Sequence, residues 1–265
     1  MGDKGGGSNM ACQLNWRNRV DSARHVLQRM LWPPQCLLCG GAGQPPSTDI
    51  CRDCEADLIP LGVACMRCAQ PLPVVAMPAC GQCLRRVPSF DRSFCAFRYE
   101  PPLAELVRSF KYRGNTAGGR LLAHLFCNRL ESRRGPWPDC IIPVPLAHQR
   151  YRERGFNQAI ELGAQIERRI GIPMRTDVVV RVRETTEQAG LKPRQRRRNV
   201  RRAFAVLRPL QAARAVVLDD VMTTGSTVNE VARVLRGAGV REVEIWAIAR
   251  AGRDAQFGAR NGAMA

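Results

Sequence analysis

The sequence predicts a doubly wound α/β domain with a parallel sheet, preceded by a small cysteine-rich module. Beyond residue 97, short apolar runs alternate with amphipathic helical stretches, and this alternation is typical of βαβ units. Between Cys36 and Cys83 the chain is instead dense in Cys, Pro and Gly and has no long apolar run, so this part cannot build a conventional core. A length of 265 residues accommodates one large domain and a small appended one.

Four segments follow from this change of composition. The first combines a Gly- and Ser-rich start with a short helix, in which apolar residues recur at helical spacing. The predicted segments are 1–31 for this start, 32–90 for the cysteine-rich module, 91–252 for the α/β domain and 253–265 for a tail.

The cysteine-rich module contains an internal repeat. Two CxxC pairs separated by eleven residues occur twice, and the second set follows the first after 29 residues. The eight cysteines are Cys36, Cys39, Cys51, Cys54, Cys65, Cys68, Cys80 and Cys83. A CxxC pair directs two thiolates at one point, and a second pair completes the four-sulfur shell that structural zinc prefers. The repeat therefore predicts two structural Zn²⁺ ions, while an iron–sulfur cluster and pairing between the two repeats stay open as alternatives.

The net charge and the cysteine content indicate which partners and which cellular compartment to expect. The chain carries 41 Lys and Arg against 23 Asp and Glu, a formal net charge of +18, so its surface should attract polyanions. The N-terminus has no apolar run of the signal-peptide type, and no stretch approaches the roughly 18 apolar residues that span a membrane. We therefore expect a cytoplasmic protein without a membrane span, in which metal rather than disulfides explains the twelve cysteines.

Within the α/β domain the apolar periodicity predicts the elements in order. Strands are expected at 140–144, 178–182, 203–207, 215–218 and 243–249, and helices at 102–110, 121–130, 157–168 and 227–236. The interval 183–202 fits neither pattern and is rich in arginine. We predict that it forms a mobile basic loop or hood.

The segment 215–227 carries the most specific pattern for ligand binding. Its apolar start suits a buried central strand, so Asp219 and Asp220 should emerge at the carboxyl end, where open α/β sheets bind ligands. The loop that follows leads into a helix N-terminus, which favours a phosphate, and consists of Thr223, Thr224, Gly225, Ser226 and Thr227. Two carboxylates beside an anion site suit vicinal hydroxyls, and together these features describe a ribose 5-phosphate.

Two other phosphate-binding patterns are excluded. No Lys follows Gly225, so the segment is not the P-loop of nucleoside triphosphatases, and no GxGxxG opens a dinucleotide-binding fold.

The segment resembles the phosphoribosyl pyrophosphate motif of type I phosphoribosyltransferases. Three further motifs are Lys111-Tyr112-Arg113-Gly114, Pro143-Val144-Pro145-Leu146 and Arg154-Gly155-Phe156-Asn157-Gln158. Together with the double CxxC repeat, they make the chain similar to the ComF competence family, which includes GntX-like proteins. The resemblance runs from about residue 32 to residue 250.

The resemblance implies a role for each matched residue. Asp219 and Asp220 would be the catalytic pair that holds the ribose hydroxyls, and the loop 223–227 would hold the 5-phosphate. The pyrophosphate side would be formed by Pro143, Val144, Pro145, Lys111, Arg113 and Arg194. Mg²⁺ is implied with the substrate, because the charge that develops on a pyrophosphate leaving group must be neutralised.

Two functions remain open at this stage. In a transferase, an acceptor nucleophile would displace pyrophosphate, and the sequence does not specify the acceptor. In a non-catalytic protein, the same fold would sense phosphoribosyl ligands or handle single-stranded DNA with the DNA-uptake machinery of natural transformation, as the resemblance implies. The second hypothesis predicts binding without release of pyrophosphate.

Overall fold

The computed structural model describes residues 34–44, 48–73, 79–130, 132–183 and 193–252. The predicted N-terminal helix and the tail 253–265 lie outside these residues. The chain divides into two compact units, Met1–Glu55 and Ala56–Ala265, which we describe separately. The second unit holds the α/β domain and also the second group of four cysteines.

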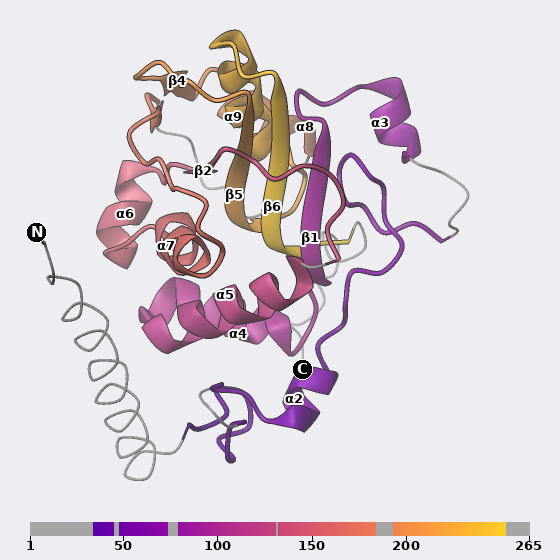
Figure 1. The fold of residues 1–265 in the computed structure, drawn as a ribbon, viewed down its shortest axis with the longest axis vertical. Coiled ribbons are helices and arrows are strands. Elements are labelled where there is room, and N and C mark those ends of the chain that lie inside the picture. Colours follow the sequence, from indigo (N-terminus) through magenta and orange to yellow (C-terminus); the bar gives the residue numbers. More distant parts are fainter. Residues whose placement is uncertain (1–33, 45–47, 74–78, 131, 184–192, 253–265) are drawn as a thin grey trace, which may run out of the picture. The chain divides into compact units, whose positions relative to one another are not determined.

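The second unit is built on a four-stranded parallel sheet with the strand order β1-β6-β5-β2 (Figure 1). The strands are β1 (Arg92–Arg98), β2 (Cys140–Pro143), β5 (Arg214–Met222) and β6 (Glu242–Arg250). All three strand pairs are parallel. The two central strands are buried along almost their whole length, as expected of strands covered on both faces. The predicted parallel sheet is confirmed.

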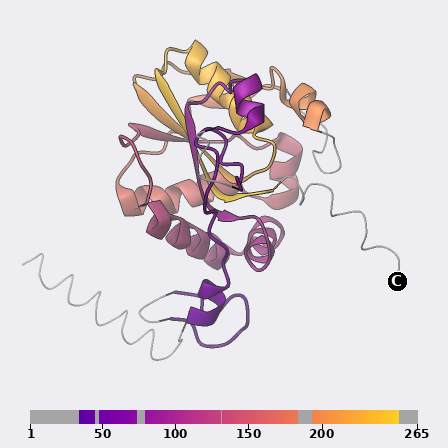
Figure 2. The ribbon, with the colours of Figure 1, turned by 90° about the vertical axis from the view of Figure 1, so that its right-hand side faces the viewer.

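Helices cover both faces of this sheet. On one face lie α4 (Leu103–Arg113), α5 (Thr116–Leu130) and α7 (Gln158–Ile170), and on the other lies α9 (Ser226–Gly237), as Figures 1 and 2 show. Neighbouring strand residues point to opposite sides, so Val217 packs towards α9 whereas Leu218 lies against α7. The arrangement is therefore doubly wound, as predicted.

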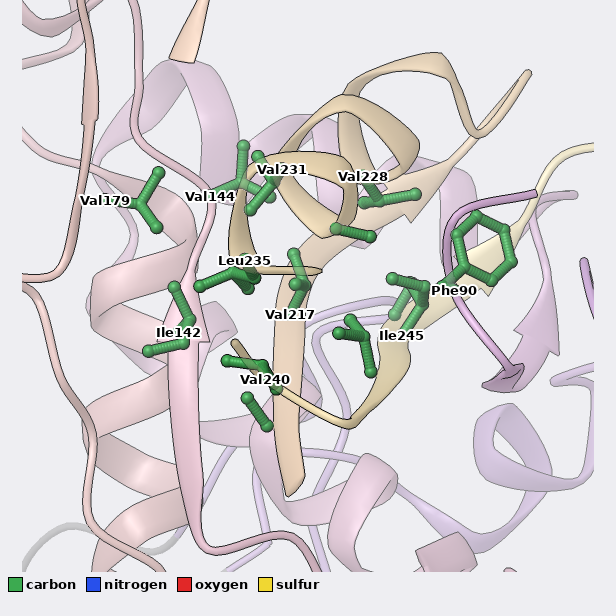
Figure 3. Packing of buried hydrophobic residues seen from close by; sticks show 14 of the residues in the cluster. Phe90, Ile142, Val144, Val179, Val217, Val228, Val231, Leu235, Val240 and Ile245 are labelled. Atoms are coloured by element: carbon green, nitrogen blue, oxygen red, sulfur yellow. The ribbon is translucent and has the colours of Figure 1, made fainter. Parts of the chain in front are cut away.

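The helix α9 packs on the sheet through one apolar face. Val228, Val231 and Leu235 recur at helical spacing and pack on Val217 and Ile245 of the central strands (Figure 3). Each such side chain contributes roughly 1.5–3 kcal/mol by leaving water. This packing holds the N-terminus of α9 at the carboxyl edge of the sheet.

Two predicted strands lie outside the parallel sheet. The segments around 178–182 and 203–207 form β3 (Val179–Arg181) and β4 (Phe204–Val206), but these pair antiparallel with each other in a separate two-stranded sheet. Their apolar runs identified the strands, but strand order depends on contacts between distant parts of the chain.

Five further elements of the described structure differ from the predictions. The prediction of a loop at 183–202 is wrong for its second half, which forms α8 (Pro193–Val200); residues 184–192 lie outside the described part. Proline suits the first position of a helix, but this arginine-rich helix has no apolar periodicity that could reveal it. Four elements were not predicted: the strand β1, the helix α6 (His148–Arg154) and the short helices α2 (Arg52–Ala56) and α3 (Gly81–Arg85). The helix α6 buries no residue at all.

Within the described residues, no helix is long and apolar enough to cross a membrane.

Candidate functional site

A cavity of about 310 Å³ opens at the carboxyl ends of β2 and β5. This is the edge at which open α/β sheets bind ligands. The segment from Asp219 to Val228 lines one side of it, and Val144, Pro145 and Leu146 line another. The remaining lining residues are Tyr99, Lys111, Tyr112, Arg150, Arg154, Asn157, Gln158, Ala159 and Arg181.

The two acidic residues lie in the last part of β5 rather than beyond it, because the strand continues to Met222. Each carboxylate is oriented by a backbone N–H: Asp219 accepts from the N–H of Asp220 at 2.9 Å, and Asp220 accepts from that of Val221 at 2.6 Å. The second carboxylate oxygen of Asp220 lies 2.9 Å from the Nζ of Lys111. The pair is thus fixed in place before any ligand arrives.

The electrostatics of this cluster bring one carboxylate close to neutrality. Burial and the neighbouring charge of Asp220 raise the pKa of Asp219 to about 7, although Lys111 opposes the shift. Burial disfavours the charged form of Lys111, but the carboxylate of Asp220 outweighs it and holds the pKa of Lys111 above its ordinary value. A carboxylate with a raised pKa, such as that of Asp219, is typical of functional sites.

The loop after β5 has a conformation that needs glycine. Gly225 precedes α9 with a φ of +71°, and a Cβ at this position would come within 2.7 Å of the Met222 side chain. The hydroxyls of Thr224 and Ser226 are 2.8 Å apart, and the N–H of Ser226 donates to Thr224 Oγ1 at 3.3 Å. Since the first N–H groups of a helix lack intrahelical partners, this loop and the start of α9 form an anion-binding arrangement.

The opposite side of the cavity is held by the start of α7. Asn157 caps this helix by accepting from the N–H of Ala159 at 2.9 Å, and its amide donates to the carbonyl of Val144 at 3.1 Å. The segment after β2 is therefore fixed to α7. Pro143 ends β2 and lies behind this lining, which begins at Val144.

Gln158 is a site residue that the sequence analysis did not single out. Its amide oxygen accepts from Arg154 at 3.1 Å, while its amide nitrogen is buried without a partner among the described residues. The Arg154 guanidinium in turn lies 5.1 Å from the ring centroid of Tyr112. A buried unpaired N–H on a cavity lining calls for a ligand acceptor. The motif 154–158 pointed to this segment, but not to the side chain.

The basic residues predicted for the pyrophosphate side are only partly described. Lys111 lines the cavity but contacts Asp220. Arg113 ends α4 and Arg194 lies in α8, and their side chains lie outside the described part of the structure. Arg150 and Arg181, which the sequence did not single out, also line the cavity.

The eight cysteines gather in two tetrads in the order of the repeat. Cys36, Cys39, Cys51 and Cys54 form the first tetrad, and Cys65, Cys68, Cys80 and Cys83 form the second. In each, the four sulfur atoms lie within 4.8 Å of one another. Pairs of sulfurs are 3.8 Å apart in the first tetrad and 3.6 Å apart in the second, close to the edge of about 3.8 Å that a tetrahedral Zn–S shell requires. Sequential pairing is confirmed.

Each tetrad also contains a thiol that ionises easily. Hydrogen bonds from the Cys68 thiol and from backbone N–H groups lower the pKa of Cys65 to about 4. Burial raises the pKa of Cys36, but hydrogen bonds from the backbone outweigh this effect and lower it to about 6. Thiolates are the zinc-binding form, so both tetrads suit a metal ion.

A second cavity, of about 820 Å³, lies between the second tetrad and the start of α9. It shares Met222, Thr224, Gly225 and Ser226 with the first cavity, so one loop borders both. Its arginines are Arg86, Arg198, Arg201, Arg202, Arg233 and Arg250. Glu230 is the one acidic residue among the described lining residues, and it pairs with Arg233 at 2.7 Å. The second cavity is therefore strongly basic.

Comparison with known proteins gives two family models and a set of relatives. A model described as a double zinc ribbon domain matches residues 27–84, and one described as a phosphoribosyl transferase domain matches residues 157–257. Competence protein F of Haemophilus influenzae is 34% identical over 224 residues, which cover 82% of this chain and 97% of that protein. The DNA utilization protein YhgH of Salmonella typhi is 34% identical over 222 residues, with the same coverage of 82% and 97%.

A solved structure of adenine phosphoribosyl transferase from Trypanosoma brucei is only weakly similar. The TM-score is 0.37 at 13% identity, and the match covers 68% of this chain and 80% of that one. The grounds for the fold are the described strands and the two family models.

Proposed function

Because the chain belongs to the family of competence protein F and the DNA utilization protein YhgH, we propose that its 310 Å³ cavity binds phosphoribosyl pyrophosphate together with Mg²⁺. One observation carries the proposal: the adjacent carboxylates of β5 and the hydroxyl-rich loop before α9 line the same cavity. An anion site next to two carboxylates matches a sugar that has a phosphate at one end and vicinal hydroxyls in the middle.

The lining residues suggest how the ligand lies. The 5-phosphate would occupy the loop 223–227 at the start of α9, and the ribose hydroxyls would donate to Asp219 and Asp220. The pyrophosphate would then extend towards Val144 and Pro145, where the unpaired amide nitrogen of Gln158 can donate to it. Lys111 holds one carboxylate oxygen of Asp220 in place and so orients Asp220 for its hydroxyl partner.

The oxygen-rich lining also fits the proposed Mg²⁺. This ion prefers oxygen ligands and keeps several waters, and the cavity offers carboxylate and hydroxyl oxygens beside the expected phosphates. Bound there, Mg²⁺ would neutralise charge on the pyrophosphate. In a transfer reaction, the bond from the anomeric carbon to the pyrophosphate oxygen breaks, a bond from that carbon to an acceptor nucleophile forms, and the acceptor loses a proton to solvent.

The second, basic cavity favours one additional function, which is contact with single-stranded DNA in the cytoplasm. Exposed arginines attract a nucleic acid backbone, and the exposed Arg201 and Arg202 line the same cavity as the loop that borders both cavities. A strand held there would lie beside the proposed phosphoribosyl site. The name of the relative YhgH agrees with such a role in DNA utilisation.

The primary test is calorimetric titration of the full chain with phosphoribosyl pyrophosphate and Mg²⁺. Replacing both acids, Asp219→Asn and Asp220→Asn, should weaken binding about 100-fold or more, since hydrogen bonds to charged groups contribute about 1.5–3 kcal/mol each. Asp139→Asn is the matched control: this carboxylate accepts from the N–H groups of Ala213 and Arg214 at the opposite, amino end of β2. It should leave the affinity unchanged.

A pyrophosphate-release assay on the same samples separates the two kinds of function. Release with a nucleobase or with DNA would identify a transferase and its acceptor. Binding without release would favour a phosphoribosyl-sensing or DNA-handling protein. Equal affinity of the double variant and the wild type would contradict the site assignment.

The DNA contact predicts a change in salt dependence. Arg201→Gln with Arg202→Gln should weaken binding of a single-stranded oligonucleotide and lower the slope of log K against log salt by about 1.4, since each phosphate contact contributes about 0.7 for single strands. Fluorescence anisotropy at several salt concentrations measures this slope. An unaltered slope would locate the nucleic acid elsewhere.

A further inference from the structure

Arg250 is a buried charged residue that the proposed site does not use. It is the last residue of β6, and only 4% of it is exposed. On one side lies the loop after β5, whose Thr223 lines the ligand cavity. On the other side lies Cys68, a member of the second tetrad. The guanidinium therefore lies between the proposed phosphate loop and a metal ligand.

Its hydrogen bonds join these two parts directly. Nε donates to the carbonyl of Cys68 at 2.9 Å. Nη1 donates to the carbonyl of Met222 at 2.9 Å and also to that of Thr223. Nη2 donates to the side-chain amide oxygen of Gln70, in the same turn of chain as Cys68, at 3.1 Å. One side chain thus fixes the backbone on both sides.

The charge of Arg250 has no carboxylate partner among the described residues. Its acceptors are the three carbonyls above, the carbonyl of Ala251 and the amide of Gln70, all of them neutral. A buried cation is costly unless an opposite charge compensates it. Four thiolates with one Zn²⁺ carry a net charge of −2, so a zinc-loaded second tetrad supplies the missing negative charge beside Cys68.

We propose that Arg250 couples the zinc content of the second tetrad to ligand binding at the loop 223–227. With zinc bound, the turn at Cys68 is fixed and Arg250 holds the carbonyls of Met222 and Thr223 in position, so the loop is ready for the phosphate. Without zinc, the turn loosens, the buried cation loses its compensation, and the loop loses its support. The inference rests on the proposed function, because it concerns the same ligand site.

Thermodynamic linkage makes the coupling reciprocal. If zinc raises the affinity for the ligand by some factor, the ligand raises the affinity for zinc by the same factor. If Arg250 only stabilised the fold, the ligand would not change the affinity for zinc through this residue. The effect of the ligand on zinc affinity therefore distinguishes a positioning role of Arg250 from a purely structural one.

The first experiment measures ligand affinity in variants of the full chain. Arg250→Gln should weaken binding of phosphoribosyl pyrophosphate with Mg²⁺ at least about tenfold, the value of one hydrogen bond to a charged group. Arg250→Lys should recover only part of this loss, because one ammonium cannot contact Cys68 and Thr223 in the way a planar guanidinium does. Arg214→Gln, whose guanidinium pairs with Asp139 at the amino end of the sheet, is the control and should stay within about twofold of the wild type.

The second experiment needs no substitution at Arg250 and so does not depend on the folding of that variant. In a Cys51→Ser background, which removes one ligand of the first tetrad, the zinc that remains reports on the second. Saturating ligand should raise the zinc affinity of the second tetrad at least about tenfold, measured by equilibrium competition with a chelator. Arg250→Gln in the same background should abolish this increase.

The outcomes separate the two proposals. If the Cys51→Ser protein binds the ligand but its zinc affinity is the same with and without the ligand, the coupling is refuted and the proposed function stands. Arg250→Gln with wild-type affinity would refute the coupling in the same way. Absence of ligand binding by the zinc-loaded wild type would overturn both.

Discussion

The two cysteine tetrads have the same ligand spacing but different surroundings. In the first, Cys39 is exposed and two more cysteines are half-buried, within the unit Met1–Glu55. In the second, three of the four cysteines are buried, and Leu61 and Ala69 around them belong to the hydrophobic cluster of the parallel sheet. The second tetrad is part of the α/β unit, whereas the first is not.

The backbone of the two repeats is nevertheless alike. A bridge joins Gln35 and Ala42 in the first repeat, and the equivalent bridge, 29 residues later, joins Ala64 and Pro71. The spacing of the cysteines thus determines the metal-binding turn, and the apolar residues between them decide what else the turn contacts. Identical metal chemistry can serve a separate module in one repeat and support a ligand loop in the other.

The largest expected effect comes from removing one ligand from each tetrad in turn. Cys51 and Cys80 hold equivalent positions in the two repeats, and each replacement by Ser should cost one zinc ion per chain. Because structural zinc contributes folding free energy, Cys80→Ser should lower the free energy of unfolding of the α/β unit by about 3 kcal/mol or more and weaken ligand binding with it. Cys51→Ser should leave both quantities of that unit unchanged.

Urea unfolding followed by circular dichroism, with metal content by mass spectrometry, measures both variants. If the two substitutions destabilised the α/β unit equally, the second tetrad would not be the one that supports this unit. Retention of two zinc ions by either variant would contradict the assignment of the tetrads.

The difference between local spacing and contacts made by distant residues also explains what the sequence could and could not predict. The tetrads and the loop 223–227 follow from residues close together in the chain, so spacing alone identified them. The apolar run before Asp219 likewise identified the central strand, although not its continuation to Met222. Local patterns are reliable where the feature itself is local.

The missed features depend on contacts across the fold. Arg250 and Cys68 are 182 positions apart, and no local pattern distinguishes this arginine from the many others. The unpaired amide of Gln158 becomes visible only when its burial is known. The helix α8 has no apolar periodicity, so its sequence resembles a charged loop.

The smallest expected effect concerns Gly40 and Ala69, which hold equivalent positions in the two repeats, 29 residues apart. Both have a positive φ, +75° and +54°, a conformation that disfavours a side chain by about 1 kcal/mol or slightly more. Ala69 is buried at 2% exposure, so its methyl group compensates by packing on the core, whereas a Cβ at Gly40 would meet nothing within 4 Å. Gly40→Ala should therefore destabilise the first tetrad by about 1 kcal/mol.

Ala69→Gly should change the stability of the α/β unit by less, because relief of the strained backbone and loss of about 0.8 kcal/mol of apolar burial nearly cancel. Zinc release against urea concentration measures the first variant, and urea unfolding of the α/β unit measures the second. If Ala69→Gly destabilised its unit by more than about 2 kcal/mol, the methyl group would contribute more than its own burial. The two repeats would then differ in packing even more than their exposure indicates, and the second tetrad would be still more closely integrated with the sheet.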